Sequence, residues 1–114
     1  MNRKEPLTEF EQMVLLSLVR LGDAAYGVTV REAIEDRTGR SVSAAATYAA
    51  LERLERRRHV ESWISPATAV RGGRAKKHFR MKEAGARALR ESRQVMARMW
   101  DGLESHPDLG AGAS

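Results

Sequence analysis

The sequence contains no cysteine and few aromatic residues, and each shortage excludes something. Without cysteine, disulfide bonds and thiolate chemistry are excluded. Because aromatic residues make up only 5% of the 114 residues, the core must be built mainly from Leu, Val, Ala and Met. No segment approaches the ~18 consecutive apolar residues of a membrane span, and the N-terminal residues lack the apolar region of a secretory signal. We therefore expect one soluble, cytoplasmic domain without membrane association or a cofactor.

Patterns typical of catalytic and metal-binding sites are also missing. His59, His78 and His106 are scattered, and no two share the i, i+3 or i+4 spacing that places two ligands on one helix face. No nucleophile turn or phosphate-binding glycine loop surrounds the Ser, His and Asp residues, since Gly72-Gly73 is too short and lies in a predicted hairpin. We therefore predict neither an enzyme nor a metal site.

Positive charge is concentrated in the middle of the chain. Residues 40–82 contain eleven Lys or Arg and three Glu, a net charge of +8, whereas the whole chain carries +5 and the rest therefore sums to −3. A run of charge is usually only a solvated helix face, and an acidic membrane surface would also attract it. Here the run coincides with a predicted helix and hairpin that suit a DNA groove, which favours a surface that neutralises phosphates.

A first helix is predicted from the capping-box pattern of Thr8 and Glu11 to about Leu21, before Gly22. It is apolar on nearly all sides, so nearly all sides must be covered. Its own core can cover one side. A second subunit or the same core can cover the other, and this segment alone leaves both possibilities open.

A second helix should begin near Tyr26 or Gly27 and end before Gly39. Together with the next helix it forms a helix-turn-helix pair. The side chains expected to face inward are Val28, Val30 and Ile34.

The third helix should begin after Ser43, a plausible N-cap, and bind the core through Tyr48, Leu51 and Leu54. Its opposite face carries small residues, which would let the helix axis sink deep into a major groove. The alternative is that alanines merely favour a helix. The residues expected to look outward are Ala45, Ala46, Ala49, Arg53 and Arg56, with hydroxyls from Ser43 and Thr47.

Two short β-type runs, residues 60–64 and 77–81, follow this helix and are separated by a basic loop. A helix followed by a hairpin with a basic tip is the layout of a winged helix-turn-helix, so we expect a mainly α fold with a small β-hairpin. A single tryptophan such as Trp63 is more often a core residue than a nucleic-acid stacking platform. The basic residues that can reach phosphates or the minor groove from the hairpin are Arg71, Arg74, Lys76 and Lys77.

The last helix, residues 83–104, carries an apolar seam with a seven-residue spacing, which suits packing against another helix. Capping its own domain is the alternative. We favour a homodimer built from this helix and the first one, with interface residues Phe10, Met13, Leu89, Met96, Met99, Trp100 and Leu103. A small-molecule effector near Met96, Met99 and Trp100 is a further hypothesis, although such stripes are more often ordinary interface.

Four stretches of the sequence match the motifs of a known family: LTEFEQMVLLSL (7–18), AYGVTVREAIEDRTGRSVS (25–43), YAALERL (48–54) and RGGRAKKHFRMKEAG (71–85). Through them the chain resembles the PadR-like transcriptional regulators, especially the short form with one C-terminal helix. The resemblance implies a winged-helix dimer that represses transcription by binding palindromic operator DNA. The family often has glycine at the positions of Ala45 and Arg58, so Arg58 should either extend the helix or adopt a left-handed conformation.

These observations predict four regions: a flexible arm (1–6), a winged helix-turn-helix DNA-binding domain (7–82), a C-terminal dimerisation helix (83–104) and a disordered tail (105–114). The predicted function is a dimeric, sequence-specific regulator, in particular a repressor, that binds an inverted repeat in double-stranded DNA. The alternative is a winged-helix protein–protein interaction module without specific DNA binding. The predicted DNA-binding residues are Ser43, Ala46, Thr47, Tyr48, Arg53, Arg56, Arg71, Arg74, Lys76 and Lys77.

Overall fold

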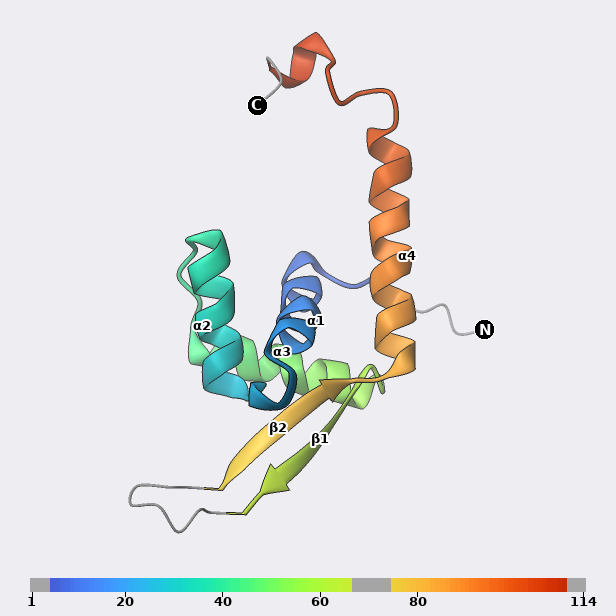
Figure 1. Ribbon diagram of the computed structural model, residues 1–114. Coiled ribbons are helices and arrows are strands. Elements are labelled where there is room, and N and C mark those ends of the chain that lie inside the picture. Colours follow the sequence, from blue (N-terminus) through green and yellow to red (C-terminus); the bar gives the residue numbers. More distant parts are fainter. Residues whose placement is uncertain (1–4, 67–74, 111–114) are drawn as a thin grey trace.

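The computed structural model describes residues 5–66 and 75–110, which form a winged helix with one long additional helix (Figure 1). Three helices pack together, a two-stranded antiparallel hairpin projects from them, and the fourth helix stands at one side. The elements in chain order are α1 (Glu9–Leu21), η1 (Gly22–Ala24), α2 (Gly27–Thr38), α3 (Ala44–Arg56), β1 (Val60–Ser65), β2 (Lys76–Met81), α4 (Glu83–Trp100) and η2 (Pro107–Leu109).

Helix α1 begins and ends where the local sequence predicts. The Thr8 N–H donates to Glu11 Oε1 (2.9 Å) and the Glu11 N–H donates to Thr8 Oγ1 (3.0 Å), which completes the capping box. At its other end Gly22 takes a positive φ of 58°. Leu16 and Val19 remain exposed, so the domain's own core covers only part of this apolar helix.

Helix α2 has the predicted bounds, and Gly39 ends it in a left-handed conformation with φ 73°. Val30 and Ile34 are buried as expected, but Val28 is exposed, so its predicted inward orientation is wrong. Residues two apart point to opposite sides of a helix. Val28 therefore cannot share the buried face that Val30 occupies.

The core lies between the first three helices and the base of the hairpin. It is aliphatic apart from a single aromatic ring, Phe79 of β2, as the composition predicted. Its buried apolar residues are Leu7, Val14, Leu15, Leu18, Ala25, Val30, Ile34, Ala50, Leu51, Leu54, Val60 and Phe79.

The two strands pair from Val60 opposite Met81 to Ser65 opposite Lys76, so each is one residue longer than predicted. Strand β2 also contacts the segment before α2, because the Phe79 N–H donates to the Ala25 carbonyl (2.9 Å). The hairpin is therefore attached directly to the helix-turn-helix. Trp63 does not enter the core as predicted: it lies on the opposite side of the hairpin from buried Phe79 and is exposed.

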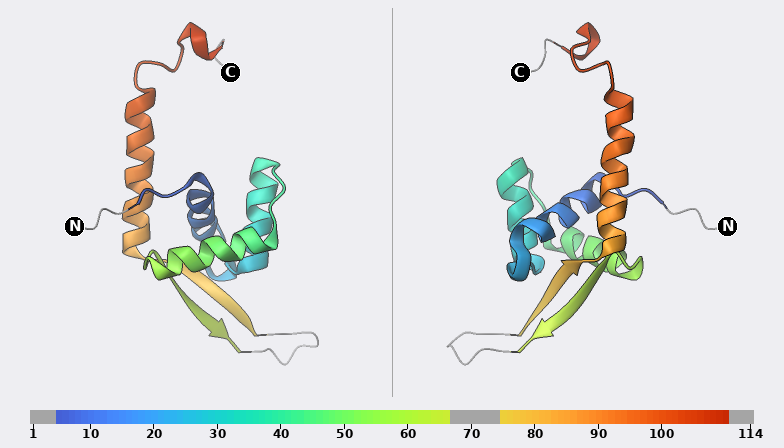
Figure 2. Two further views of the ribbon diagram at one scale, coloured as in Figure 1. Left: turned by 180° about the vertical axis from the view of Figure 1, so that it is seen from behind. Right: turned by 45° about the vertical axis from the view of Figure 1, so that its right-hand side comes forward.

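Helix α4 extends well beyond the domain, as the two views in Figure 2 show. Only its first turns pack on the core, through buried Gly85 and half-buried Ala88 and Leu89. Gly85 is required for this close packing, because a Cβ there would lie only 2.4 Å from the His59 carbonyl oxygen.

The C-terminal end differs from the prediction. Helix α4 ends at Trp100 rather than at residue 104, and Gly102 follows with φ 82°. A glycine in this conformation does not continue a helix. Residues 107–109 form the turn η2, which is capped by His106, where we expected disorder.

Candidate nucleic-acid interface

The outward face of α3 is built from small and charged residues. Ser43 caps the helix by accepting a hydrogen bond from the Ala46 N–H (3.0 Å). Leu51 and Leu54 face the core, so the residues half a turn away from them face solvent. The centre of this exposed face consists of Ala45, Ala49, Glu52 and Arg56, with Ser43 and Ala46 exposed beside it.

The positions of Thr47 and Tyr48 are exchanged relative to the prediction. Thr47 is 0% exposed and its hydroxyl donates to the Ser43 carbonyl oxygen (3.0 Å), so its predicted role as an outward-facing hydroxyl is wrong. Tyr48, predicted to bind the core, is 44% exposed. A buried stripe of Thr47, Ala50, Leu51 and Leu54 fits the helical repeat at least as well as one based on Tyr48.

Tyr48 lies across the start of α2. A Cβ at Gly27 would lie 2.2 Å from the Tyr48 ring, so the absence of a side chain at Gly27 makes room for the ring. This contact joins the two helices of the helix-turn-helix at the edge of the exposed face. Tyr48 therefore lies at the surface, as expected of a DNA-binding residue, and its ring packs on Gly27.

A buried carboxylate sets the angle between α1 and α3. Glu11 is 3% exposed, and its Oε2 accepts a hydrogen bond from Arg53 Nε (3.1 Å), while Arg57 Nη1 lies 3.8 Å from Oε1. Burial raises the pKa of Glu11, but the Thr8 N–H and the two guanidinium groups outweigh it and hold the pKa below its usual value. Arg53, predicted to look outward to DNA, is therefore partly committed to the domain itself.

Several other cations of the basic region also pair with acids on the same domain. The pairs are Arg40 with Glu9 (3.0 Å), Lys77 with Glu55 (3.7 Å) and Arg80 with Glu61, in addition to the pairs of Arg53 and Arg57. Within residues 5–66 and 75–110, Arg56, Arg58, Lys76 and Lys82 take part in no ion pair, so the charge available to phosphates is smaller than the sequence suggests.

The wing, as we call the β1–β2 hairpin, contributes Lys76, which lies at its outer end, away from the core. Its Nζ donates to Tyr26 Oη (3.2 Å) and lies 4.4 Å from the centre of the Tyr26 ring. A cation over an aromatic face keeps its charge while its direction is fixed. Arg71 and Arg74, which the sequence also assigned to DNA binding, lie outside the described residues.

Arg58 follows α3 with a φ of 64°, so it adopts the left-handed conformation that was one of the two sequence-based expectations. This conformation turns the chain from α3 into β1. It also places Arg56, Arg57 and Arg58 around the end of the candidate reading helix.

Residues 15–91 match the profile of the transcriptional regulator PadR-like family. The chain belongs to this family. A family of transcriptional regulators agrees with the expectation that the protein is not an enzyme. Of the helices in the described ranges, none is both long enough and apolar enough to span a bilayer.

Solved structures of PadR proteins share the fold. The PadR family regulator of Clostridium difficile is 20% identical with a TM-score of 0.67, over 89% of this chain and 99% of that one. The PadR family regulator of Eggerthella lenta is 26% identical with a TM-score of 0.64, over 83% and 82%. The PadR-like regulator of Bacillus cereus is 18% identical with a TM-score of 0.66, over 81% and 84%. No curated protein matches the sequence.

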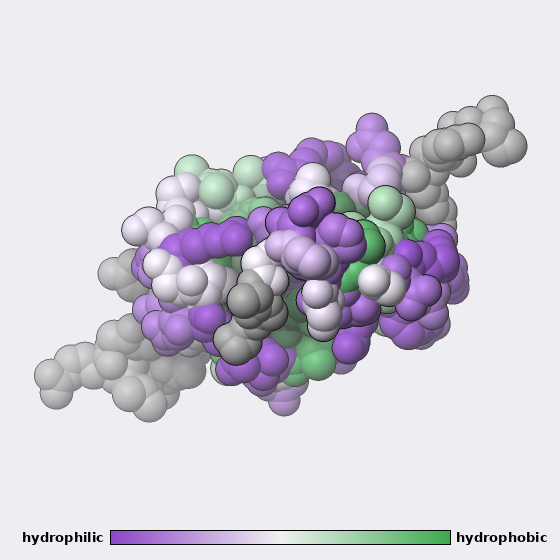
Figure 3. Space-filling model, turned by 90° about the horizontal axis from the view of Figure 1, so that it is seen from above, coloured by the Kyte–Doolittle hydropathy of each residue, from purple (hydrophilic) through white to green (hydrophobic). Residues whose placement is uncertain are grey.

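In this PadR-like chain the residues predicted for dimerisation fall into two groups. Phe10, Met13 and Leu89 are half-buried against the domain's own core. The other four, Met96, Met99, Trp100 and Leu103, are exposed beyond the domain. Figure 3, which looks down on the molecule of Figure 1 from above, shows apolar surface reaching the exterior in several places among hydrophilic residues. The exposed group is therefore available to a partner, whereas the first group is already partly used.

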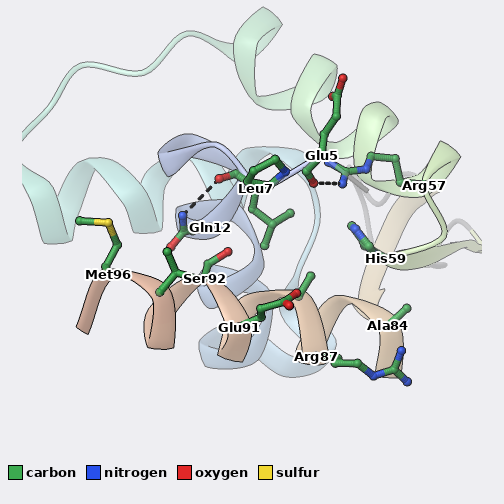
Figure 4. Close-up of a pocket in the computed structure, with 13 residues that line it drawn as sticks. Glu5, Leu7, Gln12, Arg57, His59, Ala84, Arg87, Glu91, Ser92 and Met96 are labelled. Carbon is green, nitrogen blue, oxygen red and sulfur yellow. Dashed lines mark hydrogen bonds between the residues drawn. The ribbon is translucent and has the colours of Figure 1, made fainter. Parts of the chain in front are cut away.

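A groove of about 470 Å³ separates the domain from α4 (Figure 4). Leu7, Gln12 and His59 line one side, and the N-terminal two thirds of α4, from Ala84 to Met96, line the other. Arg57 reaches over one end and donates to the Glu5 carbonyl oxygen. The groove includes Met96 but not Met99 or Trp100, so only one of the three residues near which the sequence placed an effector lies in it.

Sequence reasoning missed the contact of Glu11 with Arg53 and that of His78, whose Nδ1 lies 3.0 Å from the Asp23 carbonyl oxygen. Glu11 was recognised only as a capping residue, and its partner Arg53 lies 42 positions away. His78 was considered as a metal ligand and as a strand residue whose face the alternation did not assign. No local pattern could have revealed either contact.

Proposed function

We propose that this PadR-like chain is a sequence-specific DNA-binding regulator that acts as a homodimer and represses transcription. The observation that carries the proposal is the exposed, small-residue outer face of α3. Ala45 and Ala49 would let the helix backbone approach base edges, and a single α-helix fits the width of the major groove. Glu11 supports the proposal because it fixes this helix against α1 through Arg53 and Arg57.

The cations around α3 suit phosphate contacts on either side of such a helix. Arg56 and Arg58 lie at its C-terminal end, and Lys76 lies at the outer end of the wing. Phosphate contacts supply much of the affinity and orient the protein, whereas base contacts give the sequence preference. Glu52 on the same face would repel phosphates but could accept hydrogen bonds from cytosine. We therefore assign it to base recognition rather than to phosphate binding.

Dimerisation is supported by the apolar residues that the domain leaves uncovered. Val95, Met96, Met99 and Trp100 lie along one side of α4 and are exposed, as are Leu16 and Val19 of α1. A contiguous exposed apolar surface is typical of a protein interface. A second copy that covered it would present a second α3, and two reading helices suit half-sites about 34 Å apart.

Repression is favoured over activation because occupying the DNA is by itself enough to cause it. The described chain consists of the winged-helix domain and α4, and a dimer bound across an operator blocks other proteins from the same DNA. Activation would require a surface for an additional partner, and the proposal assigns the exposed side of α4 to the second copy.

Selection of bound sequences from a random duplex pool tests the proposal. We expect an inverted repeat whose half-sites are separated by about one helical turn. Enrichment of a single half-site would contradict dimeric reading. Recovery of no DNA at all, even at low salt where electrostatic binding is strongest, would instead support the protein–protein interaction module.

A further inference from the structure

His78 lies where three segments meet: its own strand β2, the neighbouring strand β1, and the chain that leads into α2. Its ring stacks on Trp63 of β1, with 5.3 Å between ring centres and 12° between planes. The ring of Tyr26, the residue before α2, is nearly perpendicular to it, with 5.5 Å between ring centres and 76° between planes. His78 thus touches both the neighbouring strand and the start of the helix-turn-helix, although it is only half-buried.

Both ring nitrogens of His78 have partners on different elements. Nδ1 lies 3.0 Å from the carbonyl oxygen of Asp23 in η1. Nε2 lies 3.1 Å from Ser65 Oγ at the end of β1. Ser65 Oγ in turn lies 3.4 Å from the Lys76 carbonyl oxygen, on the last described rung of the hairpin. These contacts form a continuous series of hydrogen bonds from η1 through β2 to the last described rung of the hairpin.

All the hydrogen bonds of this series can form together only when the His78 ring is charged. The Asp23 carbonyl can only accept, so Nδ1 must carry a hydrogen. In the neutral ring Nε2 is then bare and must accept the Ser65 hydroxyl hydrogen, which leaves the Lys76 carbonyl without it. In the charged ring Nε2 donates to Ser65 Oγ, and the Ser65 hydrogen is free to reach the Lys76 carbonyl.

We propose that His78 is a proton-dependent latch that fixes the wing to the helix-turn-helix and thereby strengthens DNA binding. The effect on DNA rests on the proposed function, whereas the latch itself does not. When His78 takes up its second proton, the η1–β2–β1 connection gains a hydrogen bond and a charge-assisted donor. The outer end of the wing, with Lys76, is then held in one direction.

The charged and titratable groups on the elements packed against the ring are Asp23 of η1, Tyr26 before α2, Glu61 of β1, and Lys76 and Arg80 of β2. Arg80 is paired with Glu61, and Lys76 Nζ donates to Tyr26 Oη. Histidine is the side chain that ordinarily changes charge between pH 5 and 8. The latch is therefore tested between those pH values.

Fluorescence tests the latch without DNA. Trp63 and Trp100 are the two tryptophans of the chain, so Trp100→Phe leaves Trp63 as the sole emitter. A charged imidazole in contact with an indole quenches its emission. We expect the emission of the Trp100→Phe variant to fall as the pH is lowered from 8 to 5, and to stay level when His78→Gln is added. An equal fall in both variants would overturn the latch.

DNA affinity tests its consequence, using the operator recovered from the duplex pool. From pH 8 to pH 5.5 the wild-type affinity should rise by about fivefold, the low end of ordinary coupling between two sites. His78→Gln should remove this rise. Ser65→Ala keeps the charge of His78 but breaks the chain of contacts, so it should also reduce the rise.

Three outcomes separate the possibilities. A rise that persists in Ser65→Ala would show that only the added charge matters, and this would overturn the latch. A rise that persists in His78→Gln would overturn it as well. If the wild type binds no duplex at any pH, the proposed function fails, whereas a fluorescence change that requires His78 would still support its protonation against Trp63, the first step of the latch.

Discussion

At the scale of single residues, Glu11 shows how one side chain can serve both folding and function. It caps α1 through the Thr8 N–H and holds α3 through Arg53 and Arg57. A buried carboxylate with these partners is stabilising only while the partners remain. The orientation of the candidate reading helix therefore depends on a residue that does not itself lie on the DNA-facing surface.

We expect Glu11→Gln to lower the free energy of unfolding by about 1–2 kcal/mol, because it weakens charge-assisted bonds to half-exposed arginines. Glu9→Gln is the matched control. It removes the exposed pair with Arg40 and should cost less than about 0.5 kcal/mol. Urea unfolding at pH 7 measures both, and equal losses would contradict the role assigned to Glu11.

The same carboxyl predicts a pH dependence. Because the pKa of Glu11 is lowered in the folded state, its contribution is complete above the unfolded-state pKa of about 4.3 and is lost as the pH falls through the folded-state pKa. The stability difference between wild type and Glu11→Gln should therefore shrink steadily below pH 4. A difference that stays constant down to pH 2 would argue against an ionised Glu11 as its source.

Arg58 gives a second residue-scale prediction. A non-glycine residue with a φ of 64° is strained, and the left-handed conformation costs roughly 1–2 kcal/mol. Arg58→Gly should therefore raise the free energy of unfolding by about 0.5–1 kcal/mol after the added flexibility of the unfolded chain is subtracted. Arg58→Ala removes the same charge but keeps the strain, so it should give no comparable gain. Thermal unfolding of the two variants separates strain from charge.

At the scale of elements, α3 is held from three sides: by the core through Leu51 and Leu54, by α1 through Glu11, and by α2 through the contact of Tyr48 with Gly27. A helix fixed in this way can present its exposed face at a constant angle. This is what a reading helix requires, since preorganised contacts avoid the cost of ordering on binding.

Enlarging that face should therefore damage operator recognition. We expect Ala49→Leu to weaken operator binding by at least about tenfold, or 1.4 kcal/mol, because the added side chain keeps the helix away from the base edges. Binding to random duplex should change less, since phosphate contacts remain. Ala97→Leu makes the same change on the exposed part of α4 and serves as the control; an equal loss there would point to a general effect.

Local signals predicted element boundaries well and inter-element contacts poorly. Thr8, Glu11, Gly22 and Gly39 define their helix ends through bonds or dihedral angles within a few residues, so the sequence was sufficient. Which of the adjacent residues Thr47 and Tyr48 is buried depends on the exact phase of α3 against its neighbours. The sequence alone could not determine that phase.

The same holds for the candidate site: the sequence predicted its local features but not its contacts between elements. The basic region and the small-residue face of α3 were visible in the sequence, and Ser43, Ala46 and Arg56 are exposed as expected. The pairing of Arg53 with Glu11 and of Lys77 with Glu55 was not, because those contacts span long separations. A count of charges therefore overestimated the charge left for DNA.

At the scale of the whole molecule, the exposed half of α4 is the feature that a single copy does not explain. Its apolar side continues the stripe that begins at Gly85 and Leu89 on the core, but it extends beyond the domain (Figure 1). A helix whose apolar face is covered along only part of its length favours a partner for the remainder.

Met99→Glu should therefore prevent dimerisation. Met99 is 68% exposed, so the charge costs little in a monomer but would be buried in a dimer. Gln94→Glu places the same side chain on the opposite side of α4 and should leave the dimer intact. Light scattering gives the molar mass of each variant, and a dimeric Met99→Glu protein would show that this surface is not the interface.

The central claim is that two copies of α3 read one operator from its major groove. Methylation protection tests this most directly, because it reports contact at guanine N7 in that groove. On the selected operator we predict two clusters of protected guanines, one in each half-site and about one helical turn apart. A single cluster would contradict reading by two copies of α3. Bound DNA whose guanine N7 atoms are unprotected in both half-sites would contradict contact in the major groove.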